Sequence, residues 1–276
     1  TNYAIVKGNI HYVSNDQYTN LDNVIIYPYL SSLFTVDGVK YVPISPSDRT
    51  CNVIDCEYDS TSLFINIGET ISFQGIAMRV MEIMPYTCSG NNQICKVFIS
   101  HSGSIGEQAF SNCDNLVTIE VSNKGDIGAQ VFYDCNNIKT INISNQGHIK
   151  EKAFYNCNNI ENIKIANNGD IAQLTFYNCR NIKTLSISND GKIHQEAFHN
   201  CDTLEFAHIN NTGDIENYAF HKLGCVKKMI VSNQGNVKDM AFRNCGKVDT
   251  LIITSDGNIG NEAFYASGIQ YLYVNN

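Results

Sequence analysis

The chain has 276 residues, of which 43% are hydrophobic, and its formal net charge is −8 at pH 7. The apolar fraction is sufficient for a core, whereas the acidic balance leaves no basic stripe to replace phosphate counterions and so argues against a nucleic-acid partner. No apolar run approaches the ~20 residues of a membrane-spanning helix, so we expect no membrane insertion. Residues 1–2 open no signal peptide, and if the protein is exported we expect its leader to have been removed.

The first 82 residues carry no repeat and are typical of short strands joined by tight turns. Asp37 and Gly38 lie between alternating apolar residues, which is a strong hairpin signal because both turn residues must accept positive φ. Residues 3–12 and 71–80 are two further candidate hairpins. We interpret residues 1–82 as a small β-rich N-terminal cap covering the first rung of the segment that follows.

Residues 83–276 are organised by a period of 22 residues. The period is marked by a glycine column and a phenylalanine column in the same register. The glycines are Gly103, Gly125, Gly147, Gly169, Gly191, Gly213, Gly235 and Gly257. The phenylalanines are Phe110, Phe132, Phe154, Phe176, Phe198, Phe220, Phe242 and Phe264. Columns kept in register over eight copies indicate a solenoid, in which identical positions of successive copies stack.

The predicted fold is therefore a solenoid of 22-residue repeats preceded by the cap. Stepping back one period gives a degenerate copy at residues 83–102, and near the C-terminal end the period slips by one residue. We therefore expect about nine parallel strands, which at ~4.8 Å each form a rod on the order of 40 Å long.

Each copy predicts its own local structure. Ile119 and Val121 alternate with polar residues, which indicates a short strand with one face inward. The asparagine column that includes Asn123 is expected to hydrogen-bond the turning backbone, and the glycine column to supply positive φ at a sharp corner. A tight helical turn would then carry the Phe and a following Cys inward on the opposite wall.

Six of the eleven cysteines stand three residues after the repeated Phe. They are Cys113, Cys135, Cys157, Cys179, Cys201 and Cys245. Because the spacing is that of the repeat, we interpret them as small buried side chains rather than metal ligands or redox pairs. The remaining cysteines are Cys51, Cys56, Cys88, Cys95 and Cys225. In an oxidising compartment, Cys51 with Cys56 or Cys88 with Cys95 could form local disulfides, and the odd number leaves at least one outside such pairs.

The repeat resembles a known family. Leu-x-x-Ile-x-Val-x-Asn, then Gly-x-Ile, then Ala-Phe-x-x-Cys, as at residues 109–113, 153–157, 197–201 and 241–245, is similar to the BspA-type (Treponema pallidum-type) leucine-rich repeats of bacterial surface proteins. Residues 34–44 also resemble a segment that often precedes such repeats. The resemblance covers about four-fifths of the chain. It implies an α/β solenoid, a right-handed leucine-rich repeat coil. It also implies a secreted or cell-surface protein that binds other macromolecules and has no catalytic centre.

In a solenoid, a catalytic or metal site must be built from residues on adjacent rungs. The columns of this chain contain few residues that could form one. A glycosidase needs two carboxylates, whereas Glu120 is the only acid at the outward strand positions. Asp126, Asp170 and Asp214 occur only in alternate copies, too far apart for a calcium ladder. His199 and His221 follow the Phe in neighbouring copies but have no third ligand in their column, so a column of stacked rings is favoured over zinc. We expect no catalytic, cofactor or metal site and no enzyme activity.

The outward strand positions change character along the sheet, from Thr, Ser and Asn in the first half to apolar residues in the last four rungs. The candidate ligand- or partner-binding residues are Phe206, His208, Ile230, Ile252, Tyr271 and Tyr273. Apolar side chains gathered on an outward face mark a binding patch more often than stray surface residues do. The alternatives are that the chain self-associates through this region, or that these side chains are exposed and bind nothing.

The sequence therefore predicts a non-enzymatic, adhesin-like recognition protein whose strand face binds a host or bacterial surface protein or glycan. One alternative is a structural module that forms a homodimer or larger assembly through its C-terminal edge. Another is an accessory or catalytic carbohydrate-active protein.

Overall fold

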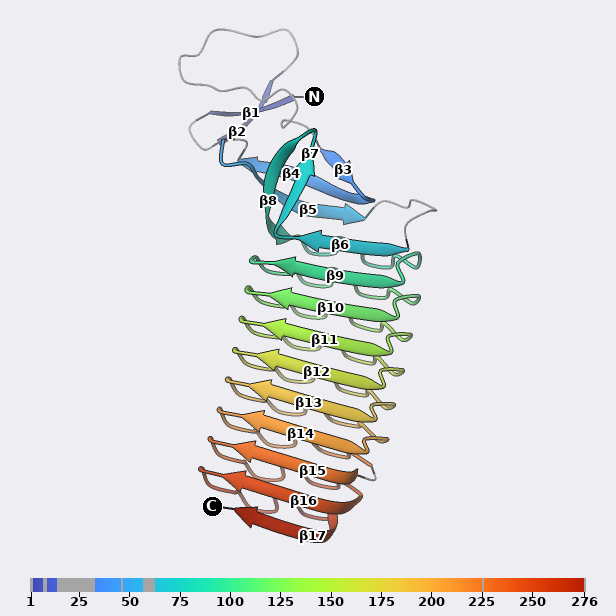
Figure 1. Ribbon diagram of the computed structural model, residues 1–276, viewed down its shortest axis with the longest axis vertical. Helices are drawn as coiled ribbons and strands as arrows, with labels where there is room; N and C mark the ends of the chain where they lie inside the picture. Colours follow the sequence, from blue (N-terminus) through green and yellow to red (C-terminus); the bar gives the residue numbers. More distant parts are fainter. Residues whose placement is uncertain are drawn as a thin grey trace.

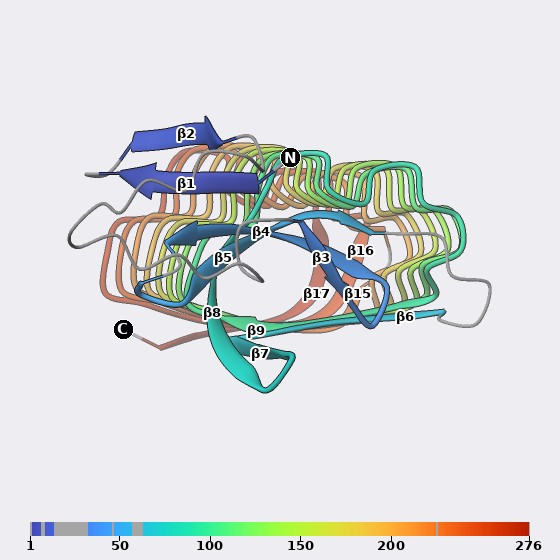
Figure 2. The same ribbon diagram turned by 90° about the horizontal axis from the view of Figure 1, so that it is seen from above.

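The computed structural model describes residues 2–6, 9–13, 33–45, 47–56, 63–224 and 226–275. A long stack of parallel strands forms most of the molecule, and a smaller sheet lies at its N-terminal end (Figure 1). Seen along the stack, the strands line one side of the coil and the connecting turns line the opposite side (Figure 2). The predicted 22-residue leucine-rich repeat solenoid with an N-terminal β-rich region is confirmed.

Nine strands of the large sheet come from the repeats, and each pairs in parallel with the next at a register of 22 residues until the last pair. They are β9 (Lys96–His101), β10 (Thr118–Asn123), β11 (Thr140–Asn145), β12 (Asn162–Asn167), β13 (Thr184–Asn189), β14 (Phe206–Asn211), β15 (Val226–Asn233), β16 (Lys247–Ser255) and β17 (Gly268–Asn275). The β16–β17 pair, in which Leu251 lies beside Leu272, contains the predicted slip of one residue.

A tenth strand precedes the repeats. β6 (Phe64–Gly68) pairs in parallel with β9 and forms the N-terminal edge of the large sheet, although its residues lie in the segment that we expected to be the cap. Ile65 and Ile67 are buried like the inward residues of the later strands. The solenoid sheet therefore begins before the first recognisable copy of the repeat.

The small sheet has five strands in the order β3-β4-β5-β8-β7. Their bounds are β3 (Phe34–Val36), β4 (Val39–Ser45), β5 (Thr50–Cys56), β7 (Thr70–Phe73) and β8 (Ile76–Ile83). The hairpins around Asp37-Gly38 and Gln74-Gly75 are both present, and all four turn residues have positive φ as the prediction required. β1 (Asn2–Val6) and β2 (Asn9–Val13) also pair antiparallel, as expected.

The wall opposite the strands is made of turns, and no helix occurs in the described ranges. The tight turn expected around the repeated Phe is present but is not helical, with hydrogen bonds between residues three apart such as Tyr155 N–H to the Lys152 carbonyl. Lys152 and Asn156 both have positive φ, and the same two positions do so in the other full copies. Two left-handed residues in each copy prevent a continuous right-handed helix from forming.

The glycine column has a different role from the one we predicted. Gly147 does not have positive φ, and a Cβ built on it would lie 2.4 Å from the carbonyl oxygen of Gly125 on the preceding rung. The same clash recurs along the column from Gly125 to Gly257. Glycine is required because successive rungs approach each other closely at this corner, so any side chain would push them apart.

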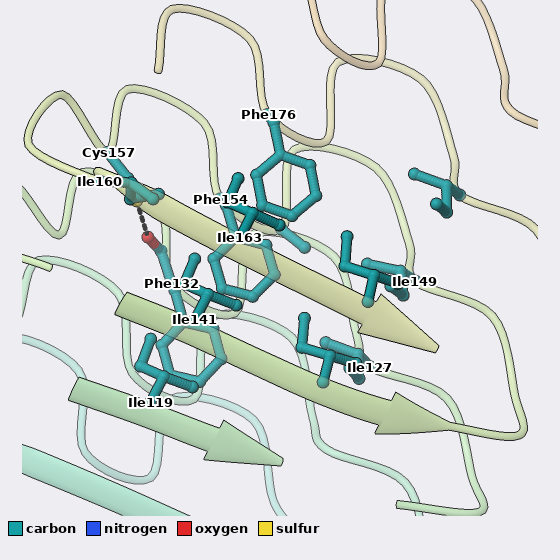
Figure 3. Packing of buried hydrophobic residues seen from close by; sticks show 14 of the residues in the cluster. Ile119, Ile127, Phe132, Ile141, Ile149, Phe154, Cys157, Ile160, Ile163 and Phe176 are labelled. Carbon is teal, nitrogen blue, oxygen red and sulfur yellow. Dashed lines mark hydrogen bonds between the residues drawn. The ribbon is translucent and has the colours of Figure 1, made fainter. Parts of the chain in front are cut away.

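The core consists of columns running the length of the solenoid. Consecutive rings from Phe110 to Phe264 stack with centroids 4.8–5.4 Å apart, and columns of inward isoleucines lie beside the column of rings (Figure 3). The repeat cysteines are buried and free, as predicted. Each also uses its S–H as a donor to the preceding rung, as where Cys157 Sγ lies 3.0 Å from the Phe132 carbonyl oxygen (Figure 3).

The predicted asparagine column forms a continuous hydrogen-bonded ladder at the end of the strands. The Asn145 Nδ2 donates to the Gly147 carbonyl at 2.7 Å and to the Asn167 Oδ1 at 2.9 Å, and the pattern repeats on each rung from Asn123 to Asn211. The ladder satisfies buried polar groups that would otherwise destabilise the close-packed corner.

The disulfide in the structure is neither of the two pairings left open above. Cys56 at the end of β5 bonds Cys88 in the first back-wall turn, with their Cα atoms 5.2 Å apart. Parallel pairing of β5 with β8 brings the two together although they are 32 residues apart in sequence. Cys51 and Cys95 are free, and Cys225 lies outside the described residues. This bond ties the small sheet to the first rung.

Candidate binding surfaces

Alternate residues of each strand point away from the core and build the outward face of the large sheet. Register places one outward position of every rung in a single row across β9–β17. In chain order this central row is Phe98, Glu120, Asn142, Lys164, Ser186, His208, Ile230, Ile252 and Tyr273. Its first half is mainly polar and its second half mainly apolar, on strands whose inward residues are nearly the same.

The six residues predicted from the sequence come together on β14–β17. His208, Ile230, Ile252 and Tyr273 are consecutive members of the central row, while Phe206 and Tyr271 lie in the parallel row two residues earlier. We call these six residues the apolar patch. The exposed fractions of residues Phe206, Tyr271 and Tyr273 are 46%, 55% and 56%, and the two isoleucines are half-buried. The Lys227 ammonium lies 5.7 Å from the centroid of the Phe206 ring.

A shallow groove lies over the polar half of the same face, and the sequence did not reveal it. Its volume is about 670 Å³, and it extends over β6 and β9–β12. The polar and aromatic residues that line it are Asn66, Phe98, Ser100, Glu120, Ser122, Asn142, Ser144 and Lys164, and the apolar residues Ile99, Val121, Ile143 and Ala166 complete the lining. We call it the polar groove. The only sign of it in the sequence was the run of small residues at Ser100, Ser122, Ser144 and Ala166. Their short side chains leave space beside the longer side chains of the central row.

A second hollow of about 370 Å³ adjoins the polar groove where the strands end. Glu69, His101 and Asn123 contribute to its lining. His101 stands where the asparagine ladder would continue, and its Nδ1 accepts the Gly103 N–H at 2.8 Å. In the described part of the chain, the buried His101 Nε2 and Asn123 Oδ1 have no hydrogen-bond partner. Burial, opposed by the negative charge of Glu69, lowers the pKa of His101 to about 4.

The acidic residues of alternate copies hold rungs together. Asp126 Oδ1 accepts the backbone N–H of His148 at 2.8 Å, and its other oxygen lies 3.1 Å from the Lys150 ammonium. Burial alone would raise the pKa of Asp126, but the His148 N–H and the Lys150 ammonium lower it below the usual value. Asp170 and Asp214 make equivalent contacts. Each carboxylate is thus engaged by its own neighbours.

His199 and His221 lie in the predicted column of rings on the back wall. Tyr133, Tyr155 and Tyr177 stack in turn, and the His199 and His221 rings follow with centroids 4.6 Å apart. Burial, followed by the positive charge of neighbouring groups including His199, lowers the pKa of His221 to about 4.

The described residues of the back wall and of the strand face do not form a metal-binding set. Among the described residues, no group of three or more His, Cys, Asp or Glu side chains lies close enough to hold a metal ion. Glu120 is the one carboxylate among the residues that line the polar groove. No helix in the described ranges is long and apolar enough to span a membrane.

The sequence pattern described as BspA type Leucine rich repeat region matches residues 81–205 and 170–276, in six copies. The chain belongs to the BspA-type leucine-rich repeat family. The match covers β9–β17 and every rung that carries the polar groove and the apolar patch, apart from β6.

Three solved structures are similar to this BspA-type chain. A leucine-rich repeat protein from Bacteroides ovatus is 20% identical, with 87% of this chain and 70% of that one covered and a TM-score of 0.45. A leucine rich cell surface protein from Faecalibacterium prausnitzii is 13% identical, with 89% and 95% covered and a TM-score of 0.47. The T. pallidum leucine-rich repeat protein is 18% identical, with 63% and 91% covered and a TM-score of 0.40. No curated protein matches the chain.

The last described strand of this BspA-type solenoid has an uncovered inner face. Leu272 and Val274 continue the inward columns of β16, yet their side chains are 55% and 52% exposed. Ile259 on the last turn is 44% exposed. These residues form an apolar end surface distinct from the outward-facing apolar patch.

Proposed function

We propose that this chain is a non-enzymatic recognition module that binds a partner protein through the apolar patch on β14–β17. The observation that carries the proposal is the contiguity of the six residues on four neighbouring strands. Exposed aromatic and aliphatic side chains in one patch are the usual anchors of protein interfaces. Membership of the BspA-type family supports an interaction module rather than an enzyme.

The surroundings of the apolar patch also favour a protein partner. Lys227 and Lys228 are exposed beside it, and Lys227 pairs with Glu205 at 2.6 Å. An apolar centre with charged groups at its margin is the arrangement in which rim charges steer association and the centre supplies affinity.

A cell-surface or secreted location is part of the proposal. The Cys56–Cys88 disulfide supports it, because disulfides persist mainly in oxidising compartments outside the cytosol.

The test is a binding array of extracellular-matrix, serum and bacterial surface proteins probed with the intact chain and with a triple variant. The variant, Ile230→Ser with Ile252→Ser and Tyr273→Ser, should lose binding to the proteins that the intact chain retains while its thermal midpoint changes little. Ser186→Ala, in the same row but outside the patch, is the matched control. Binding by the triple variant equal to that of the intact chain contradicts the proposal.

A second candidate function is self-association through β17, the last described strand of the large sheet. Leu272 and Val274 are in core positions without a covering rung in the described residues, and β17 pairs on one side only. A second copy meeting this strand would bury both. Sedimentation over a concentration series separates the two functions, because a persistent monomer disfavours assembly. Leu272→Lys would dissociate a dimer built on this surface and leave the apolar patch intact.

A further inference from the structure

We infer that the polar groove over β6 and β9–β12 is a binding site for a neutral, hydroxyl-rich glycan. The site lies on different strands from the apolar patch and does not depend on the proposed function. It is carried by the shape of the groove, the chemistry of its lining and the state of the charged groups within it.

The lining presents donors and acceptors together. The Asn142 amide and the neighbouring serine hydroxyls do both, Glu120 accepts and Lys164 donates. A sugar hydroxyl also donates and accepts, so it is satisfied by such a mixed surface. All these side chains are exposed, and they project from strands held rigidly in register.

An aromatic ring lies at the β9 end of the groove. Phe98 is half-buried, and its ring makes an edge-on contact with Phe64 at a centroid distance of 4.9 Å. The apolar C–H face of a sugar ring packs on such a platform while its hydroxyl rim meets the polar lining. Because each rung advances by ~4.8 Å, a linear glycan crossing the strands would meet Phe98, Glu120, Asn142 and Lys164 in turn.

The charged groups of the groove are free to meet a ligand. In the described part of the chain, no ion pair or hydrogen bond joins the Glu120 or Lys164 side chain to a neighbour. On the flank of the same sheet, by contrast, Glu161 lies 2.8 Å from the Lys183 ammonium and 3.7 Å from that of Lys139.

Other ligand classes fit the polar groove less well. A polyanion is disfavoured because Lys164 is the one cation among the lining residues and Glu120 lies two rungs away. A peptide adding as a strand needs a free sheet edge, whereas β9–β12, which carry most of the groove, are paired on both sides within the sheet. A peptide anchored by apolar side chains needs a deep pocket for its anchors, and this hollow is shallow.

Affinity electrophoresis of the intact chain tests the inference, in native gels containing soluble mannan, β-glucan, xylan or galactan, with a heparin gel for comparison. We expect retardation in at least one neutral polysaccharide. The double variant Phe98→Ala with Asn142→Ala should weaken that binding at least about tenfold. Asn162→Ala, an exposed asparagine on the same strand face outside the groove, is the matched control and should bind as the intact chain does.

Two further variants make the result specific. Phe98→Leu keeps apolar bulk and removes the ring, so it should weaken binding even if Phe98→Ala disturbs folding. The triple variant of the apolar patch should bind the polysaccharide normally, which separates this site from the proposed protein interface. Absence of retardation in every neutral gel, retardation in heparin alone, or full binding by the double variant overturns the inference. Peptides held by the groove in place of any neutral glycan would assign it to a different partner.

Discussion

The polar groove and the apolar patch are two regions of one sheet face, built on rungs whose interiors are nearly identical. Ile141 and Ile143 point inward on β11 as Leu251 and Ile253 do on β16, and stacked Phe rings lie behind both strands. Outside, Asn142 in the groove occupies the same row as Ile252 in the patch. The stack thus fixes the inward columns and leaves outward positions free to acquire separate binding properties.

The largest expected effect comes from the ring column that both regions share. Phe154→Ala removes a ring stacked at 5.1 Å and 4.8 Å on its two neighbours and leaves a cavity in the middle of the stack. We expect a loss of about 3–5 kcal/mol in the free energy of unfolding. Urea denaturation followed by circular dichroism measures it. A loss below about 1 kcal/mol would show that the column does not hold the two regions together.

The second largest loss of stability is expected from the asparagine ladder. Asn167→Ala removes the side chain that bonds Gly169, Asn189 and Asn145, and it leaves buried polar atoms of its neighbours unpaired. The expected loss is about 2–3 kcal/mol in the free energy of unfolding. Asn162→Ala, exposed on the same strand, should change it by less than about 0.5 kcal/mol. Equal losses for the two variants would contradict the internal role of the ladder.

At His101, at the N-terminal end of the asparagine ladder, we expect a smaller change in the free energy of unfolding, and a gain rather than a loss. His101→Asn should extend the ladder by one rung, pair the free Asn123 Oδ1 and stabilise the chain by about 1 kcal/mol at pH 7. Urea midpoints of the two proteins at pH 7 check this gain. A variant less stable than the parent would show that the ladder does not accept another member here.

The same substitution has a pH signature. The pKa of His101 is about 4 in the folded chain and near 6.5 when unfolded, so between these values the unfolded chain binds more protons. Stability is full above pH 6.5 and falls as the pH drops toward 4. His101→Asn should lose less stability than the parent between pH 7 and pH 5, although His221 keeps part of the dependence. If the variant lost as much stability as the parent between pH 7 and pH 5, the pH dependence would not come from His101.

The smallest stability effect is expected in the apolar patch. Ile252 is half-buried on the outward face, so Ile252→Ser should change the free energy of unfolding by less than about 1 kcal/mol. Its main consequence should be weaker binding of the partner protein. A loss as large as that of Phe154→Ala would place Ile252 in the core and remove it from the binding surface.

The period of 22 was enough to predict the columns, because stacked equivalent residues are what a solenoid requires. The hairpin turns through Asp37-Gly38 and Gln74-Gly75 were predicted from their turn residues and the apolar alternation around them. The period of 22 missed β6 because Ile65 pairs with Val97, which is 32 residues later rather than 22. The Cys56–Cys88 disulfide was not predicted for a similar reason, because parallel pairing of β5 with β8 brings together residues that no local sequence pattern connects.

One of the two candidate surfaces could be predicted from the sequence and the other could not. The apolar patch could be predicted because Phe206, Ile230 and Tyr273 break an otherwise polar outward pattern. The polar groove could not, because Ser and Asn at outward positions are ordinary surface residues until the volume between the rows is known.

The central claim is that the two halves of one face bind different ligands independently. It is tested most directly by measuring the affinities of the patch triple variant and of Phe98→Ala with Asn142→Ala for the retained polysaccharide and the retained protein. We predict that each variant loses one ligand and keeps the other within about twofold. Loss of both ligands by either variant with its fold intact, or retention of both, would contradict the claim.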